Sequence, residues 1–373
     1  MYSSARPLDY VVVGNKNRVQ GLDALRAVAI GSVLFFHLGK IAEELSPSFS
    51  HPALNVLQFG KFGVELFFCI SGYVISLSLN NHKSAKVFIA ARFFRLWPSL
   101  IIVNGIIAFL WISTLFPHSF FVPLSGYDFF ISILLIDPTL LNLFLTDESH
   151  WTTGVLWSLS IEIIFYVASA VGWYFLKIKS HLSISFLVLI YATLHYFLKF
   201  FELPETLRLL DTFLWGSTVL YLPWFVIGSI LFEITSSRMN IKRNITHLFC
   251  VILFLQAAMT QSRDFNGLLN SFIFLLAPVL ITLITWVAIT KNLSLDNRVG
   301  RSFLFLGRIS YEFYLCHEFF ITLIAFQIDK EVVSLNGKSL LMVLVLTSAS
   351  VFTLLAARNI ESLAIKIRRT VRR

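Results

Sequence analysis

Apolar residues run along this chain in blocks that are separated by shorter polar segments. An apolar block of about 20 residues is long enough to cross a bilayer as an α-helix. The pattern predicts membrane-spanning helices at residues 19–39, 59–79, 97–116, 151–176, 183–201, 212–234, 244–262, 269–290, 303–325 and 338–357. We therefore expect an all-α fold, a polytopic membrane bundle of about ten transmembrane helices.

The composition agrees with this class, since 57% of the residues are hydrophobic, only 14% are charged and Phe occurs 38 times. Such values are typical of an integral membrane protein and exclude an ordinary soluble domain. We divide the chain into a cytoplasmic N-terminal lead at 1–18, one transmembrane domain at 19–357 and a basic cytoplasmic tail at 358–373.

The net charge of +9 does not indicate a nucleic-acid partner, because the Lys and Arg residues lie in short loops between apolar blocks. They concentrate in alternate loops, which is the distribution that sets membrane topology. We expect both termini in the cytoplasm and the lipid bilayer, rather than nucleic acid, as the partner of this charge. The three cysteines lie in apolar blocks without a CxxC spacing, so we expect packing roles and no metal site.

The first block carries Asp23, Arg26 and His37 in an otherwise apolar helix. Arg26 and His37 are eleven residues apart, so they project from one face about 16 Å apart along the axis. Because a charge facing lipid costs several kcal/mol, this face must meet other helices or a wet cavity. A neutral imidazole there can take a proton from a hydroxyl. The alternative is a histidine that only forms hydrogen bonds within the bundle.

Arg92 and Arg95 lie three residues apart, just before the third predicted helix and at its cytoplasmic boundary. Two guanidinium groups on one helical face form a fork that suits phosphate groups. The alternative reading is that they only set topology.

Further polar residues interrupt other spans. The second span holds Glu65 and the run Ser71-Gly72-Tyr73, where Gly either admits close approach of a ligand or serves plain helix packing. The fourth span holds Trp157, Glu162 and Tyr166, and Glu162 needs a proton or a cationic partner such as Arg26 or a charged imidazole. The ninth span holds Tyr311, Tyr314 and His317, which form either a structural polar seam or part of a site.

Five short motifs in this order are similar to those of acyltransferase family 3, a family of membrane O-acyltransferases. They are Gly21-Leu-Asp-Ala-Leu-Arg26 with His37; Gly63-Val-Glu-Leu-Phe-Phe with Ser71-Gly72-Tyr73; Arg92-Phe-Phe-Arg95-Leu-Trp-Pro98; Trp157-Ser-Leu-Ser-Ile-Glu162-Ile-Ile-Phe-Tyr166; and Leu306-Gly-Arg-Ile-Ser310-Tyr311 with His317.

The resemblance implies transfer of an acyl group, usually acetyl, from cytoplasmic acyl-CoA to a hydroxyl of a carbohydrate or lipid-linked glycan. Acyl-CoA would be a co-substrate, and no cofactor would be bound permanently. The resemblance also implies a bacterial cytoplasmic membrane as the location.

The resemblance further assigns residues to roles. His37 corresponds to the catalytic base and Arg26 to its companion. In the mechanism that we expect, Glu162 is a third catalytic residue, and Glu162 or Asp23 stabilises the imidazolium. Arg92 and Arg95 correspond to the pair that holds the CoA phosphates. The remaining assignments are Ser71, Gly72 and Tyr73 to the acyl-CoA site, and Asp23, Glu65, Trp157, Tyr166, Tyr311, Tyr314 and His317 to the acceptor end or the tunnel.

Two other classes fit the same residues. Buried ionisable groups in a multi-span bundle also serve a transporter or flippase that performs no covalent chemistry, and a sensor or scaffold could retain a vestigial pocket. The sequence leaves open the acceptor, the acyl chain length, the oligomeric state and the oxyanion donor, for which Ser71, Tyr311 and a backbone N–H near Gly72 are candidates.

Overall fold

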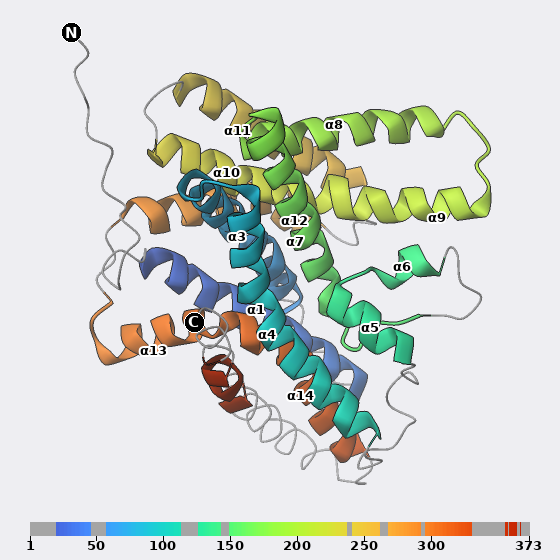
Figure 1. Ribbon diagram of the computed structural model, residues 1–373, viewed down its shortest axis with the longest axis vertical. Coiled ribbons are helices and arrows are strands. Elements are labelled where there is room, and N and C mark those ends of the chain that lie inside the picture. Colours follow the sequence, from blue (N-terminus) through green and yellow to red (C-terminus); the bar gives the residue numbers. More distant parts are fainter. Residues whose placement is uncertain are drawn as a thin grey trace.

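The computed structural model describes residues 20–45, 57–112, 126–142, 149–236, 241–261, 268–291, 295–329, 355–356, 358–363 and 366. Every regular element within these ranges is a helix (Figure 1), so the all-α prediction is confirmed for them. The elements are α1 (Gln20–Leu45), η1 (Gln58–Lys61), α3 (Phe62–Asn81), α4 (Ala85–Ile112), α5 (Gly126–Leu134), α6 (Pro138–Leu141), α7 (Leu156–Ala170), η3 (Val171–Leu176), α8 (Ser180–Leu198), α9 (Glu205–Leu214), η4 (Trp215–Tyr221), α10 (Leu222–Ser236), α11 (Ile241–Gln261), α12 (Leu268–Thr290), α13 (Arg298–Arg308) and α14 (Ser310–Asp329).

Six helical segments in the described ranges are long and apolar enough to cross a bilayer. They are Gln20–Lys40, Gln58–Asn81, Ala85–Phe109, Leu156–Leu176, Ser180–Leu198 and Glu205–Ser236. The predicted spans at 244–262 and 269–290 coincide with α11 and α12. The predicted span at 338–357 lies outside the described residues except for 355–356. The count of about ten spans and the cytoplasmic termini stay predictions.

Helix α4 begins earlier than the sequence predicts, at Ala85 rather than at residue 97. Ser84 explains the start, because its Oγ accepts a hydrogen bond from the N–H of Val87 at 3.4 Å and its carbonyl accepts one from Phe88 at 3.1 Å. Hydropathy marks the apolar part of a helix, not its end, and this helix continues through its basic residues. Arg92 and Arg95 therefore lie inside α4 rather than ahead of it.

The predicted span at 303–325 is divided at Ile309, which has φ −89° and ψ 6° between α13 and α14. The break follows a close contact, since a Cβ on Gly307 would lie 1.8 Å from the backbone oxygen of Asp23 in α1. Helix α13 leaves the bundle direction there and exposes Arg298, Arg301 and Arg308. The prediction of one continuous helix is wrong at this point.

Helices α3 and α10 pack closely through two glycines. An ideal Cβ on Gly72 would lie 2.0 Å from the backbone oxygen of Phe225, and one on Gly228 would lie 1.8 Å from that of Cys69. Ser229 Oγ donates to the backbone oxygen of Gly72 at 3.2 Å. Small residues that let two backbones touch are the usual means of joining helices in a membrane, where the hydrophobic effect between helices is lost.

The outward faces carry bulky apolar side chains that no other part of the described chain covers. Examples are Phe186 and Leu189 on α8, Phe249 on α11 and Leu283 on α12, all of which are exposed. In Figure 1, α8 and α9 project to the right as two adjacent helices, and α1 and α14 lie in the lower half. Such surfaces on long apolar helices face hydrocarbon, so this is an integral membrane protein.

The α3–α10 contact generates a stability prediction. A Gly228→Ala substitution places a methyl group against the backbone of Cys69, and overpacking of this kind costs about 1–3 kcal/mol. We expect a lower melting temperature for the detergent-solubilised protein, followed by intrinsic fluorescence or by loss of the monodisperse peak on size-exclusion chromatography.

Gly105→Ala in α4 is the matched control, because nothing lies within 4 Å of a Cβ at Gly105. Alanine at a free helical position is favoured over glycine by about 1 kcal/mol, so this variant should melt at the same or a higher temperature. Equal destabilisation by the two substitutions would contradict the packing account.

Candidate functional site

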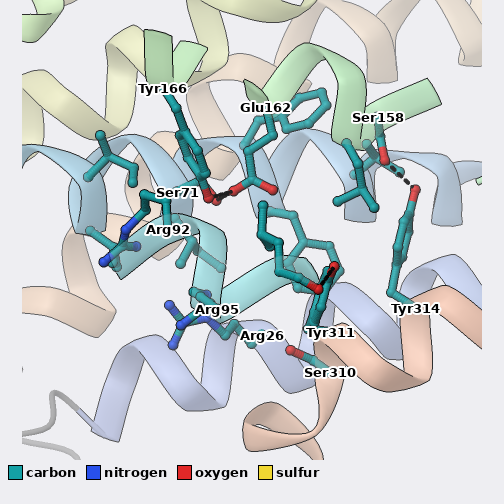
Figure 2. A pocket seen from close by; sticks show the side chains of 18 residues that line it. Arg26, Ser71, Arg92, Arg95, Ser158, Glu162, Tyr166, Ser310, Tyr311 and Tyr314 are labelled. Atoms are coloured by element: carbon teal, nitrogen blue, oxygen red, sulfur yellow. Dashed lines mark hydrogen bonds between the residues drawn. The ribbon is translucent and has the colours of Figure 1, made fainter. Parts of the chain in front are cut away.

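A polar cavity lies among α1, α3, α4, α7 and α14 (Figure 2). Its cavity volume is about 70 Å³, and the space not filled by protein atoms is about 710 Å³ when the open solvent at its mouth is included. We call it the arginine cavity, and its polar lining consists of Arg26, Ser71, Arg92, Arg95, Ser158, Glu162, Tyr166, Ser310, Tyr311 and Tyr314.

Three guanidinium groups gather at one end of the arginine cavity, with Ser158 and Tyr314 at the other (Figure 2). Arg92 Nη2 donates to Ser78 Oγ at 3.1 Å, and its buried Nε has no hydrogen-bond partner among the described residues. Arg26 Nη1 lies 2.9 Å from Asp23 Oδ1. Converging guanidinium groups in a partly dry cavity are suited to polyanions such as phosphate groups.

Glu162 is held inside this cavity by two hydroxyl groups. Its Oε1 accepts hydrogen bonds from Ser71 Oγ at 2.7 Å and from Tyr166 OH at 2.6 Å. These bonds tie α7 to α3 and stabilise the negative charge of the carboxylate opposite the arginines. The structure therefore brings Glu162, Ser71 and Tyr166 together with Arg92 and Arg95.

His37 lines a second cavity, which we call the histidine cavity. Its cavity volume is about 240 Å³, and the space not filled by protein atoms is about 720 Å³ when open solvent is included. Its lining consists of Val33, Phe36, His37, Lys61, Val64, Glu65, Gly154, Val155, Trp157, Tyr221, Tyr314 and Glu318. The rings of Trp157 and Tyr221 stand 4.8 Å apart between centroids. Glu318 Oε2 accepts a hydrogen bond from the N–H of Val155 at 3.0 Å.

The two cavities share part of their wall, because Val64 and Tyr314 line both. The Tyr314 hydroxyl lies 2.8 Å from Ser158 Oγ and donates to the backbone oxygen of Val155 at 3.3 Å. This side chain is therefore fixed between the cavities. The shared wall lies at the end of the arginine cavity that is opposite the guanidinium groups (Figure 2).

Each shared helix contributes to the two cavities at different points along its length, with the arginine-cavity residue first in the chain on α1 and α14 and the histidine-cavity residue first on α7. On α1, Arg26 lines the arginine cavity and His37 the histidine cavity, about 16 Å further along the axis. On α7, Glu162 lines the first cavity and Trp157 the second; on α14, Tyr311 lines the first and Glu318 the second. The cavities are therefore stacked along the helix axes.

This stacking separates two residues that the sequence analysis paired. Arg26 lines the arginine cavity and not the histidine cavity, so it lies with Arg92 and Arg95 rather than beside His37. Glu162 and Asp23, the expected partners of the imidazolium, are not among the residues that line the histidine cavity. Asp23 is instead the hydrogen-bond partner of Arg26.

Among the described residues, two aromatic rings lie next to His37. Its ring centroid lies 5.2 Å from that of Phe36 and 4.9 Å from that of His317. His317 itself is fully buried and lines neither cavity, so it does not face the tunnel as the sequence analysis expected.

Gly72 and Tyr73 also differ from their expected place in the acyl-CoA site. Gly72 faces the backbone of α10, where no room is left for a ligand, and Tyr73 packs its ring against Phe232 of α10. Neither residue lines the arginine cavity. Both therefore pack helices together, whereas Ser71, one position earlier, does face the cavity.

Two of the candidate oxyanion donors are engaged within the protein. Ser71 Oγ donates to Glu162, and Tyr311 OH donates to the backbone oxygen of Leu96 at 3.0 Å. Each would have to exchange this bond to stabilise an oxyanion.

The sequence analysis did not assign Lys61, Tyr221 or Glu318 to the site, although all three line the histidine cavity. Glu318 directly follows His317, which the sequence analysis did assign, so its place next to a candidate residue could have identified it. Tyr221 closes the π-helical turn η4, and π-helical turns often occur at functional sites, but sequence does not reveal them. No group of three or more His, Cys, Asp or Glu in the described residues could hold a metal ion.

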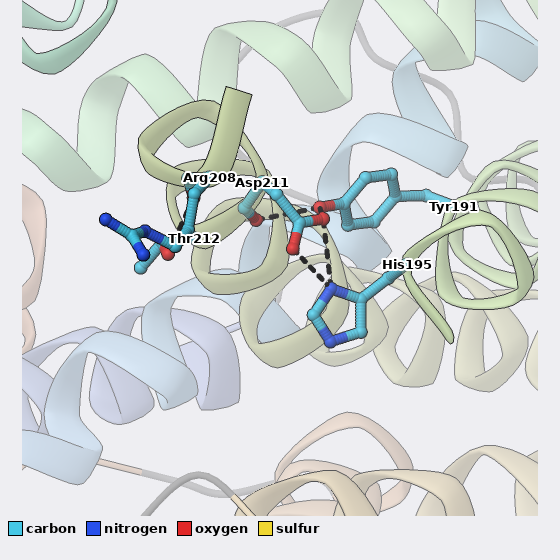
Figure 3. A network of polar contacts seen from close by, with 5 residues as sticks. All are labelled: Tyr191, His195, Arg208, Asp211 and Thr212. Carbon is cyan, nitrogen blue, oxygen red and sulfur yellow. Dashed lines mark hydrogen bonds and ion pairs between the residues drawn. The ribbon is translucent and has the colours of Figure 1, made fainter. Parts of the chain in front are cut away.

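A separate polar network joins α8 to α9 away from both cavities (Figure 3). Asp211 accepts hydrogen bonds from Tyr191 OH at 2.6 Å and lies 2.8 Å from His195 Nδ1. The His195 ring also lies against Trp215, with 4.1 Å between centroids. These bonds hold the two helices side by side, which is a structural role.

Comparison with known proteins gives one informative result. A family model described as an acyltransferase domain matches residues 19–357. No curated protein and no solved structure matches the chain.

Proposed function

Because the chain belongs to the acyltransferase 3 family, we propose that this acyltransferase is an acyl-CoA-dependent O-acyltransferase that acts across the membrane. It moves an acyl group, most simply acetyl, from cytoplasmic acyl-CoA to a hydroxyl of a carbohydrate or lipid-linked glycan. The observation that carries this proposal is the pair of stacked cavities, one lined by guanidinium groups and the other by an imidazole, with a shared wall at Val64 and Tyr314.

The arginine cavity supports binding of the nucleotide end of acyl-CoA. Phosphate oxygens accept charge-assisted hydrogen bonds from guanidinium groups in a fixed fork, and Arg92 and Arg95 present such groups from one face of α4. Arg26 adds a third group from α1. The uncharged pantetheine arm then extends along the cavity toward Tyr314, so that the thioester lies at the shared wall.

The histidine cavity supports binding of the acceptor. The paired rings of Trp157 and Tyr221 offer an apolar face for a sugar ring, and the carboxylates of Glu65 and Glu318 offer acceptors for its hydroxyl groups. His37 lines the same space.

The proposed reaction needs one base. His37 removes the proton of the acceptor hydroxyl as its oxygen bonds to the thioester carbonyl carbon. The tetrahedral intermediate collapses, the carbon–sulfur bond breaks, and the proton passes from His37 to the departing CoA sulfur. The products are an O-acyl ester and free CoA, and His37 returns to its neutral form. Holding both substrates at one wall supplies the proximity that the step requires.

The location follows from the same scheme. Acyl-CoA is a cytoplasmic metabolite, so the arginine cavity opens on the cytoplasmic side and both termini lie there, in agreement with the distribution of Lys and Arg in the sequence. We place the protein in a bacterial cytoplasmic membrane, with the histidine cavity toward the outer face.

The base assignment predicts a loss of turnover in the His37→Gln variant. General bases contribute about 10²–10⁴-fold to rate, so labelled acetyl incorporated from [¹⁴C]acetyl-CoA into the native membrane glycan fraction should fall by at least about 100-fold.

His247→Gln is the control, because His247 lies on α11 outside both cavities. It should transfer acetyl at the wild-type rate. A His37→Gln protein that inserts normally and keeps full transfer would refute the assignment, and acetyl-CoA or glycan carried across the membrane without covalent label would favour a transporter.

The donor assignment predicts a different kinetic signature. Arg92→Ala and Arg95→Ala should each raise the KM for acetyl-CoA by about 10-fold or more, since a hydrogen bond to a charged group is worth about 1.5–3 kcal/mol. The kcat at saturating acetyl-CoA should change much less, because binding rather than the chemical step is weakened.

Arg301→Ala in α13 removes an exposed arginine that lines neither cavity, so it is the matched control. Its KM should equal that of the wild type. An unchanged KM in the Arg92→Ala and Arg95→Ala variants would contradict the proposal that these arginines bind the CoA phosphates.

A further inference from the structure

The fully buried side chain of His317 has no assigned role in the reaction above. It lies on α14 with 0% of its surface exposed, although an imidazole carries two polar nitrogens. The ring of Phe313 stacks over it at 6.4 Å, and that of Tyr314 lies at 5.5 Å. A buried polar group without a hydrogen bond costs free energy, so both nitrogens of this ring need an explanation.

One nitrogen is accounted for. His317 Nδ1 lies 2.7 Å from the backbone oxygen of Tyr314. A carbonyl oxygen can only accept a hydrogen bond, so Nδ1 carries the proton in this contact. In the neutral ring the lone pair is therefore on Nε2, and His317 is a hydrogen-bond acceptor at that atom.

The other nitrogen lacks a partner. His317 Nε2 is buried and has no hydrogen-bond partner among the described residues. The nearest of the three rings around it is that of His37, at 4.9 Å between centroids and 74° between planes. Two imidazoles joined by one N–H···N bond have centroids about 5 Å apart, so this separation suits such a bond.

We infer that His317 is a positioning residue for His37, and this inference rests on the proposed function. His317 Nε2 has no partner in the described part of the structure as it stands. When the His37 ring turns its N–H toward this atom, the bond that forms fixes the tautomer of His37 and leaves the lone pair of its other nitrogen for the acceptor hydroxyl. A base that is oriented by a third group is the arrangement of the catalytic triads, where the orienting group holds the ring and stabilises the cation that forms.

The consequence for the reaction is a defined path for the proton. The acceptor hydroxyl gives its proton to the free nitrogen of His37, and the resulting imidazolium keeps its N–H bond to His317. The same proton then leaves with the CoA sulfur. His317 keeps its own proton on the Tyr314 carbonyl throughout, so no further donor or acceptor of protons is required.

A pair of substitutions separates positioning from space filling. His317→Leu keeps a similar volume without an acceptor atom, whereas His317→Gln restores an amide oxygen that can accept an N–H. With [¹⁴C]acetyl-CoA and the native membrane glycan fraction, we expect His317→Leu to lower kcat by about 100-fold with the KM for acetyl-CoA unchanged, and His317→Gln to recover about tenfold of that loss.

A double-variant experiment completes the test. If His317 acts through His37, the His37→Gln/His317→Leu protein should be no slower than His37→Gln alone, because residues that act as a unit are strongly non-additive. The melting temperature of each variant is measured in parallel. The inference is overturned if His317→Leu keeps the wild-type kcat, or if the losses of kcat in the two single variants multiply in the double variant. It is also overturned if His317→Leu and His317→Gln lose kcat equally and in proportion to their drop in melting temperature. The proposed function fails separately, if His37→Gln itself keeps full transfer.

Discussion

A guanidinium or carboxylate group that faces hydrocarbon costs several kcal/mol, and this cost constrains every polar side chain in the helices. Arg26, Arg92 and Glu162 lie on three different helices, and all of them face one protein-lined cavity. The bonds between Arg26 and Asp23 and between Glu162 and Tyr166 satisfy part of their charge within the protein. The helices are arranged so that these ionisable groups face one another and the arginine cavity instead of lipid.

The second requirement is a rigid frame for this arrangement. Gly72 and Gly228 bring the backbones of α3 and α10 into contact, and Ser71, next to Gly72, then points the other way into the arginine cavity. Tyr314 is fixed by Ser158 and Val155 between the two cavities. Close packing on one face of α3 thus holds the polar groups on its other face at defined positions, which is what a site with two substrates needs.

The sequence predicted the features that depend on local pattern. Helix periodicity placed Arg26 and His37 on one face, and the spacing of Arg92 and Arg95 placed both on one face of α4. The sequence pattern did not predict features that depend on contacts between distant segments. The approach of Gly307 to Asp23 divides the ninth span, and the packing of α14 against α1 places His317 next to His37. The early start of α4 is a different case, because it follows from the local cap at Ser84, which hydropathy does not mark. Short motifs predicted candidate site residues but not which of them share a cavity.

The central claim is that donor and acceptor meet from opposite faces of the membrane, through cavities stacked along the helix axes. The most direct test uses proteoliposomes that contain the native lipid-linked glycan fraction only in the lumen, with [¹⁴C]acetyl-CoA added only outside and intact vesicles verified by dye retention. Molecules whose arginine cavity faces outward should label the luminal glycan while all CoA stays outside. Label that appears only when acetyl-CoA and glycan share the same compartment would contradict the account.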